Sequence, residues 1–141
     1  MSARTMGERS ADENVYVGIP PTLPPGPATA QFVLMGKLTT HVLDTASGNP
    51  AAGVRIRLYR GGALLTERVT NAGGRCDEPL LADAPAGGYQ LQFSMGDYFR
   101  NAGNPSAFLD EIPIHFLVEP GRDHHVPLAC SPYSYSTYRG S

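Results

Sequence analysis

The sequence predicts an antiparallel β-sandwich of about eight strands with one short helix. From residue 37 onward, short stretches in which apolar and polar residues alternate are separated by Gly, Pro, Asn and Ser about every 8 to 12 positions. Only residues 97–103 have the composition of a short helix. The 141 residues are enough for one domain with its own core and too few for two ordinary ones.

The first half of this domain shows the alternation most plainly. In residues 38–43 Leu, Thr and Val alternate with Thr, His and Leu, and in residues 54–59 Val, Ile and Leu alternate with Arg, Arg and Tyr. Because successive side chains of a strand point to opposite faces, each stretch presents one apolar face to a core. Turns are expected at 47–50, 61–62 and 71–74, between strands at 38–43, 54–59 and 64–70 and a short strand that follows Arg75 and ends at Leu81.

The second half continues the pattern around the single helix. Residues 89–95 place two aromatic residues and a leucine on one face. Asp97 stands near the expected start of the helix and Gly103 at its end. Further strands are expected at 112–119, 124–130 and 133–138, with a tight turn at 120–123.

Charge and hydropathy exclude several classes of function. The chain has 11 basic and 13 acidic residues and a net charge of −2, so it lacks the basic surface that binds nucleic acid or an anionic membrane. No apolar stretch approaches the roughly 20 residues of a membrane-spanning helix, and the start of the sequence does not resemble a signal peptide. We therefore expect a cytoplasmic protein. Charged residues make up only 17% of the chain, which indicates extra surface buried between subunits.

The first 35 residues differ from the rest in composition. Five prolines lie between residues 20 and 27, where they fix φ, remove hydrogen-bond donors and favour polyproline II over helix or strand. We interpret residues 1–35 as a mobile or extended arm and residues 36–141 as the folded domain. A ligand for a proline-reading module is the alternative interpretation of this arm.

The residues able to carry chemistry are few. The four histidines are His41, His115, His124 and His125. Asp123 with its two neighbouring histidines suggests a metal site, but consecutive strand residues point to opposite faces and cannot easily reach one ion. No nucleophile elbow or phosphate-binding glycine loop is present. We therefore expect neither a metal nor a cofactor, and we interpret the two cysteines as free thiols.

Five segments in a fixed order carry a family resemblance. They are Leu-Thr-Thr-His-Val-Leu-Asp at 38–44, Thr-Asn-Ala-Gly-Gly-Arg-Cys at 70–76, Gly-Asp-Tyr-Phe at 96–99, His-Val-Pro-Leu at 125–128 and Tyr-Arg-Gly-Ser at 138–141. With this set, the chain resembles the 5-hydroxyisourate hydrolases, the transthyretin-related enzymes of urate breakdown. It departs from the family at His124, where an aromatic residue is usual, and in the proline-rich arm.

The resemblance implies a fold, an assembly and a set of site residues. The fold would be that of transthyretin, with two four-stranded sheets, assembled as a homotetramer that is a dimer of dimers with active sites in the channel between dimers. The substrate would be 5-hydroxyisourate and the product 2-oxo-4-hydroxy-4-carboxy-5-ureidoimidazoline. His41, Arg75 and His125 would be catalytic, with His41 and Arg75 also binding substrate, and Tyr138 and Ser141 would line the pocket through a hydroxyl and the terminal carboxylate.

The chemistry of these residue types agrees with that assignment. Imidazole has an unperturbed pKa of about 6.5 and acts as base or acid near neutrality. Arginine stays charged and offers a planar fork of donors to a developing oxyanion. The sequence does not assign the base to one histidine. Two rivals remain, a small-ligand carrier on the transthyretin scaffold and an immunoglobulin-like interaction module, although the latter usually has a core Trp that this chain lacks.

Overall fold

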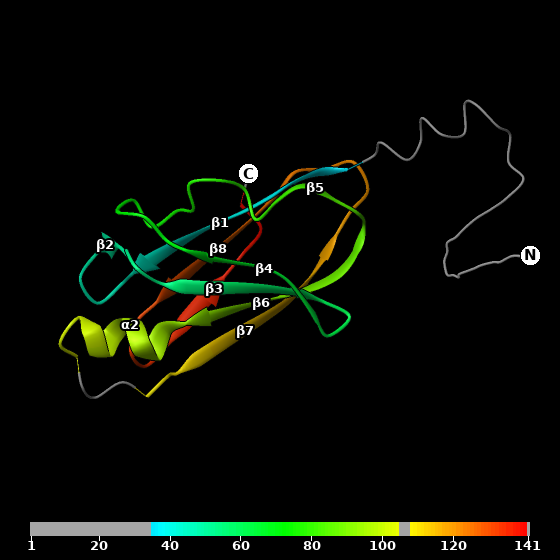
Figure 1. Cartoon of the computed structure of the whole chain (residues 1–141). Coiled ribbons are helices and arrows are strands. Elements are labelled where there is room, and N and C mark those ends of the chain that lie inside the picture. The colour runs from blue at the N-terminus through cyan, green and yellow to red at the C-terminus, as the bar shows by residue number, and fades with distance from the viewer. Residues whose placement is uncertain (1–34, 105–107, 141) are drawn as a thin grey trace, which may run out of the picture. The chain divides into compact units, whose positions relative to one another are not determined.

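The computed structural model describes residues 35–104 and 108–140 (Figure 1). Within these residues the chain forms two β-sheets and one short helix, which confirms the predicted fold class. The predicted arm, except for Met35, lies outside the described residues, as does Ser141. The elements are β1 (Gly36–Asp44), β2 (Asn49–Pro50), β3 (Arg55–Arg60), β4 (Ala63–Val69), β5 (Leu81–Ala84), β6 (Gly87–Ser94), α2 (Met95–Asn101), β7 (Glu111–Val118), β8 (His124–Cys130) and β9 (Tyr135–Thr137).

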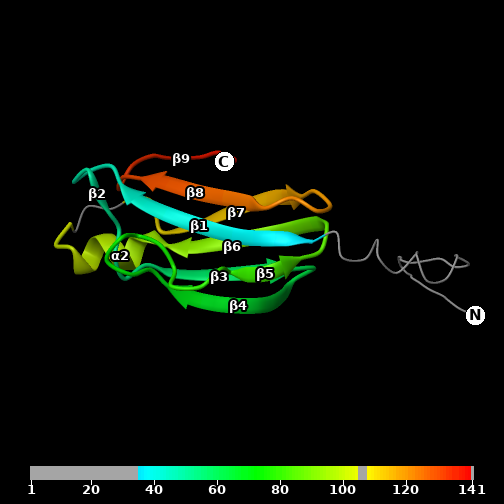
Figure 2. The ribbon, with the colours of Figure 1, turned by 90° about the horizontal axis from the view of Figure 1, so that it is seen from above.

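The two sheets stack face to face. The first sheet has the order β2-β1-β8-β9, with β5 also paired to β1, and the second has the order β4-β3-β6-β7. Figure 2 shows β9, β8 and β1 side by side in one layer. The strands pair antiparallel with one exception, because β1 and β8 run parallel from Leu38 beside His124 to Asp44 beside Cys130. This pair departs from the expected antiparallel sandwich, since alternation within a strand carries no information about the direction of its partner.

The core lies between the sheets and is built from the faces that alternation predicted. Strands β1, β3, β6, β7 and β8 contribute their inward-facing side chains, and most of these exclude water almost completely. Burying a single leucine, isoleucine or phenylalanine contributes roughly 1.5–3 kcal/mol, so the core fixes the register of these strands. The largest fully buried side chains are Phe93, Phe99, Leu38, Ile56, Leu58, Leu80, Leu91, Met95, Ile112 and Leu128.

The segment after Arg75 differs from the sequence prediction. The strand expected to end at Leu81 does not form; instead Arg75 makes an isolated bridge to His41, and β5 begins at Leu81. Pro79 lies in this segment and has no N–H to donate to a strand ladder, which accounts for the interruption. The last strand, β9, is also shorter than the predicted 133–138.

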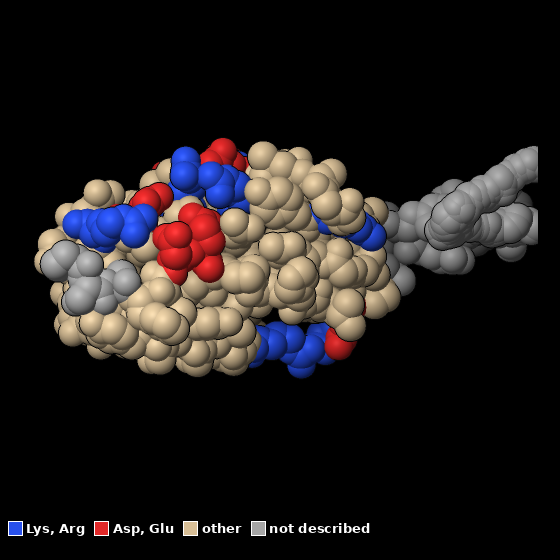
Figure 3. Space-filling view, turned by 90° about the horizontal axis from the view of Figure 1, so that it is seen from below, with Lys and Arg blue, Asp and Glu red and all other residues tan. Residues whose placement is uncertain are grey.

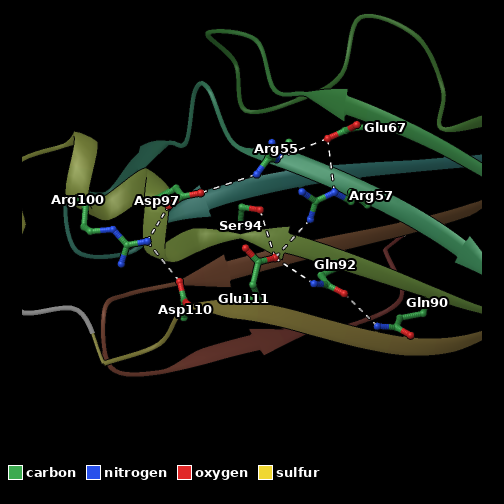
Figure 4. Close-up of polar contacts among 10 residues, drawn as sticks. All are labelled: Arg55, Arg57, Glu67, Gln90, Gln92, Ser94, Asp97, Arg100, Asp110 and Glu111. Carbon is green, nitrogen blue, oxygen red and sulfur yellow. Dashed lines mark hydrogen bonds and ion pairs between the residues drawn. The ribbon is translucent and has the colours of Figure 1, made fainter. Parts of the chain in front are cut away.

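Charged side chains on the outer face of the second sheet neutralise one another (Figure 4). Arg57 lies 3.5 Å from Glu67 and 3.8 Å from Glu111, so one cation joins β3 to two neighbouring carboxylates. Arg55 extends the chain of contacts to Asp97 of α2 at 4.0 Å. Exposed pairs of this kind add little stability individually. Their consequence for function is that these charges are already satisfied within the sheet.

Candidate active site

The outer face of the first sheet gathers three of the predicted site residues. His41 lies on β1 and His125 on the adjacent β8, both on the face that points away from the core. Arg75 bridges to His41 from one side, and Gly140 bridges to His125 from the other. Four chain segments far apart in sequence therefore meet in one strip across the sheet.

A tight turn presents Arg75 to this strip. The side-chain oxygen of Asn71 accepts hydrogen bonds from the backbone of Gly73 at 2.9 Å and of Arg75 at 3.2 Å. The carbonyl of Gly74 accepts the N–H of Val42 at 2.8 Å, which ties the turn to β1. Gly74 has φ of 75°, and a Cβ there would lie 2.4 Å from the Val42 carbonyl oxygen, so only glycine fits. The turn holds the backbone of Arg75 beside β1.

His41 is held with one ring nitrogen already occupied. It is half-buried, and its ring hydrogen-bonds to the backbone of Gly73. Since this bond favours the protonated ring, the imidazole N–H donates and the Gly73 carbonyl accepts. Burial lowers the pKa of His41, the positive charge of Arg75 lowers it further, and the bond to Gly73 opposes both effects. The second nitrogen of the neutral ring therefore presents a lone pair.

His125 is fixed from both sides. Its Nδ1 lies 2.9 Å from the hydroxyl oxygen of Thr39, its neighbour on β1. Gly140 packs against the other side, and a Cβ there would lie 2.7 Å from Cδ2 of the ring. Burial lowers the pKa of His125, with smaller contributions from the positive charge of Arg75 and from His41. At neutral pH the strip thus holds one permanent cation and two neutral imidazoles.

A cavity of about 390 Å³ opens along this strip, lined by Lys37, Thr39, Arg75, Asp123, His124 and His125. Arg75 is exposed, and among the described residues it makes no ion pair. The available guanidinium suits a ligand with carbonyl or anionic oxygen atoms. His41 does not line this cavity itself but lies beside it through its bridge to Arg75.

The end of the chain is attached through its backbone and not through its tyrosine side chains. The N–H of Gly140 donates to the carbonyl of His125 at 2.7 Å. Tyr138 is 63% exposed and borders a different cavity of about 140 Å³, which also touches β7. In the described part of the structure Tyr138 makes no hydrogen bond to the three site residues, and Ser141 lies outside that part. Tyr133 and Tyr135 are also exposed, so all three of these tyrosines are open to solvent in the single chain.

The other two histidines do not present their rings to the strip, although His124 borders the cavity. His124 is buried on the opposite face of β8, and its Nε2 accepts the N–H of Glu119 at 3.2 Å. Its Nδ1 must then carry the proton and donate to the Arg122 carbonyl at 3.0 Å. This imidazole closes the β7–β8 turn, which gives a structural reason for a histidine at a position where the resemblance led us to expect an aromatic residue. His115 is exposed on the second sheet.

Two contacts at the site were not foreseen from the sequence. Thr39 and Asn71 each hold a predicted site residue, although neither was singled out as functional. The available signal was weak: Thr39 is a polar residue on the same face as His41, and Asn71 begins the turn that precedes Arg75. Within residues 35–104 and 108–140, no group of three or more His, Cys, Asp or Glu side chains is arranged to hold a metal ion.

Comparison with known proteins gives consistent matches. The model of the HIUase/Transthyretin family matches residues 38–140. A 5-hydroxyisourate hydrolase from Mesorhizobium japonicum is 56% identical over 115 residues, which are 75% of this chain and 93% of the relative. The structure of Klebsiella pneumoniae 5-hydroxyisourate hydrolase has a TM-score of 0.68 and 38% identity, covering 75% of this chain and 94% of that one.

A longer protein contains a similar domain. The crystal structure of an (S)-allantoin synthase has a TM-score of 0.71 and 42% identity, covering 76% of this chain but only 44% of that chain. Among the described residues, no helix is long and apolar enough to cross a membrane.

Proposed function

The chain belongs to the HIUase/Transthyretin family, and we propose that its histidine–arginine strip hydrolyses 5-hydroxyisourate to 2-oxo-4-hydroxy-4-carboxy-5-ureidoimidazoline. The activity is that of a cyclic amide hydrolase in urate catabolism. The observation that supports these residue roles best is the meeting of His41, Arg75 and His125 on one sheet face beside an open cavity. Two neutral imidazoles and one available guanidinium are the groups that hydrolysis of a ring amide requires.

The first step is the attack of water on a ring carbonyl. His41 takes a proton from water through the nitrogen that is not bonded to Gly73, while the water oxygen bonds to the carbonyl carbon. The carbonyl oxygen becomes an oxyanion, which the guanidinium of Arg75 stabilises through its N–H donors. A positioned base contributes typically 10²–10⁴-fold in rate, and one oxyanion donor about 10²–10³-fold.

The second step opens the ring. The tetrahedral intermediate collapses, the carbon–nitrogen bond of the six-membered ring breaks, and the former carbonyl carbon becomes a carboxyl group. The proton that His41 removed from water passes through solvent to Nε2 of His125, which delivers it to the leaving ring nitrogen, so both imidazoles end neutral. No cofactor enters these steps. The carbonyl of Gly73 supports the choice of His41 as base, because an acceptor at one nitrogen leaves the lone pair on the other.

We also propose that the enzyme is a cytoplasmic homotetramer, a dimer of dimers. The low charge of the surface supports assembly, and on the face shown in Figure 3 the charged side chains gather in a few groups with a wide uncharged area between them. Leu117 on the edge strand β7 is 76% exposed and Tyr138 is 63% exposed. Light scattering should give about four times the chain mass of 15.1 kDa.

The direct test is an ultraviolet time course on freshly generated 5-hydroxyisourate. We expect His41→Ala, Arg75→Ala and His125→Ala each to lower turnover about 100-fold or more, with melting close to that of the wild type. His115→Ala and Arg55→Ala are matched controls, because both residues are exposed on the second sheet. Wild-type protein that binds a substrate analogue and leaves the spontaneous rate unchanged would support a carrier instead.

A further inference from the structure

We propose that Thr39 is a positioning residue that orients the imidazole of His125 and lets its Nε2 alternate between proton donor and acceptor. The proposal rests on the hydrolysis proposed above. Thr39 and His125 are direct partners in the parallel β1–β8 ladder, and the hydroxyl oxygen lies 2.9 Å from Nδ1. Both residues are half-buried, so water competes only weakly for this hydrogen bond.

The contact leaves one orientation for the ring. Thr39 holds the Nδ1 side, and the backbone of Gly140 packs against the Cδ2 and Cγ side. Among the described residues, the ring of His125 has no other hydrogen-bond partner. Nε2 is therefore the nitrogen left for a molecule in the cavity, which His125 itself lines.

A hydroxyl is a suitable partner for a ring that changes its protonation. It accepts a hydrogen bond when Nδ1 carries the proton, and it donates one when Nδ1 has the lone pair. In the first case Nε2 presents a lone pair, takes up a proton to form the imidazolium and delivers that proton to the leaving nitrogen; in the second case Nε2 presents an N–H to the ligand. The Gly73 carbonyl at His41 accepts only, so His41 keeps one arrangement while His125 has two. This difference assigns proton delivery to His125 and proton removal to His41.

Thr39→Val tests the role because valine keeps the β-branched shape and loses the hydroxyl. We expect kcat to fall about 10–100-fold while KM changes less than threefold, because the orientation of a proton donor is lost and the cavity is kept. The acidic limb of the pH profile should move to lower pH, since the imidazolium loses an acceptor and hydrogen bonds to charged groups are the stronger ones. Arg75 and His41, the charged and titratable groups that lower the pKa of His125, stay in place in this variant.

Two further variants separate positioning from stability. Thr39→Ser keeps the hydroxyl and should restore most of the activity and the wild-type pH profile. Thr40→Val is the matched control, because the buried hydroxyl of Thr40 donates to the Val126 carbonyl at 2.7 Å on the opposite face. That control should lower the melting temperature and leave the pH profile unchanged. Thr39→Ala replaces Thr39→Val if the valine variant does not fold.

A two-bond proton–nitrogen NMR spectrum gives a readout independent of turnover. In the wild type, His125 should titrate with both tautomers contributing, and in Thr39→Val the balance between the Nδ1 and Nε2 signals should change. Unchanged kcat, pH profile and tautomer balance in Thr39→Val would overturn the proposal. Absence of hydrolysis by the wild type would instead overturn the proposed function, and the spectrum would still decide whether Thr39 sets the tautomer.

Discussion

Gly140→Ala is the substitution whose effect the structure defines most sharply. An ideal Cβ at this position lies 2.7 Å from Cδ2 of His125 and 3.3 Å from Cγ. Gly140 is not among the described glycines with positive φ, so alanine meets no backbone strain there. The imidazole of His125 is therefore what opposes a side chain at residue 140.

The size of the effect follows from the overlap. Ordinary van der Waals contact begins at 3.4 Å, so the ring and the added methyl must separate by about 0.7 Å, the difference between 3.4 and 2.7 Å. A misplacement of about 1 Å in a catalytic group can cost 10²-fold. We expect kcat/KM to fall about 10–100-fold, equivalent to about 1.4–2.7 kcal/mol of transition-state stabilisation. Overpacking of this kind should also lower the free energy of unfolding by about 1–3 kcal/mol.

The assay is the ultraviolet time course with 5-hydroxyisourate, run beside thermal melting. Gly88→Ala is the matched control, because Gly88 of β6 likewise has no positive φ and its added Cβ would meet only Leu117 at 3.7 Å. That variant should keep wild-type turnover. If Gly140→Ala matched Gly88→Ala in both turnover and melting, the end of the chain would not position His125.

Four further outcomes follow from the same structure. Because burial lowers the pKa of both site histidines, the acidic limb of kcat/KM should have its midpoint below the ordinary 6.5. The free energy of unfolding should also fall as pH drops below 6.5, since the unfolded chain takes up protons that the folded histidines do not, and His125→Ala should weaken this dependence in urea titrations at several pH values. Tyr98→Phe removes a 2.8 Å hydrogen bond to the buried Asp44 and should lower the free energy of unfolding by about 1.5 kcal/mol, with activity within twofold in the same time course. Removal of residues 1–35 should leave turnover and the number of chains per particle in light scattering unchanged, since five prolines and the lack of a hydrophobic period give that segment no regular apolar face to bury.

Alternation within single strands was enough to predict most of the fold. β1, β3 and β6 formed with their predicted faces inward, because each has an apolar residue at every second position and a glycine- or proline-containing turn nearby. The strand expected before Leu81 failed because Pro79 interrupts it, although the residues around it have ordinary strand propensity. The parallel pairing of β1 with β8 could not be predicted, since no local pattern encodes the direction of a distant partner.

The contacts within the candidate site were even harder to predict from local patterns than the pairing of the strands. The family resemblance indicated His41, Arg75 and His125 from short motifs, without any distances between them. The contact between Thr39 and His125 joins residues 86 positions apart and depends on the register of β1 against β8. A shift of that register by one residue would turn one of the two side chains toward the core. Contacts of this kind follow from the packing of both sheets and are not encoded in either motif.

The two sheets differ in whether their charged side chains already have partners, and this difference bears on how one scaffold serves either binding or catalysis. On the second sheet, the half-buried Arg57 is matched by carboxylates at 3.5–3.8 Å, so that face has few charges left for a ligand. On the first sheet, Arg75 has no described carboxylate partner and two imidazoles lie nearby. Backbone bridges hold Arg75 against β1 and Gly140 against β8. Both strands are anchored by fully buried core residues. A protein with the same sheets but without these side chains would keep the cavity and lose the proton transfer, which is why function must be argued from the strip and not from the sandwich.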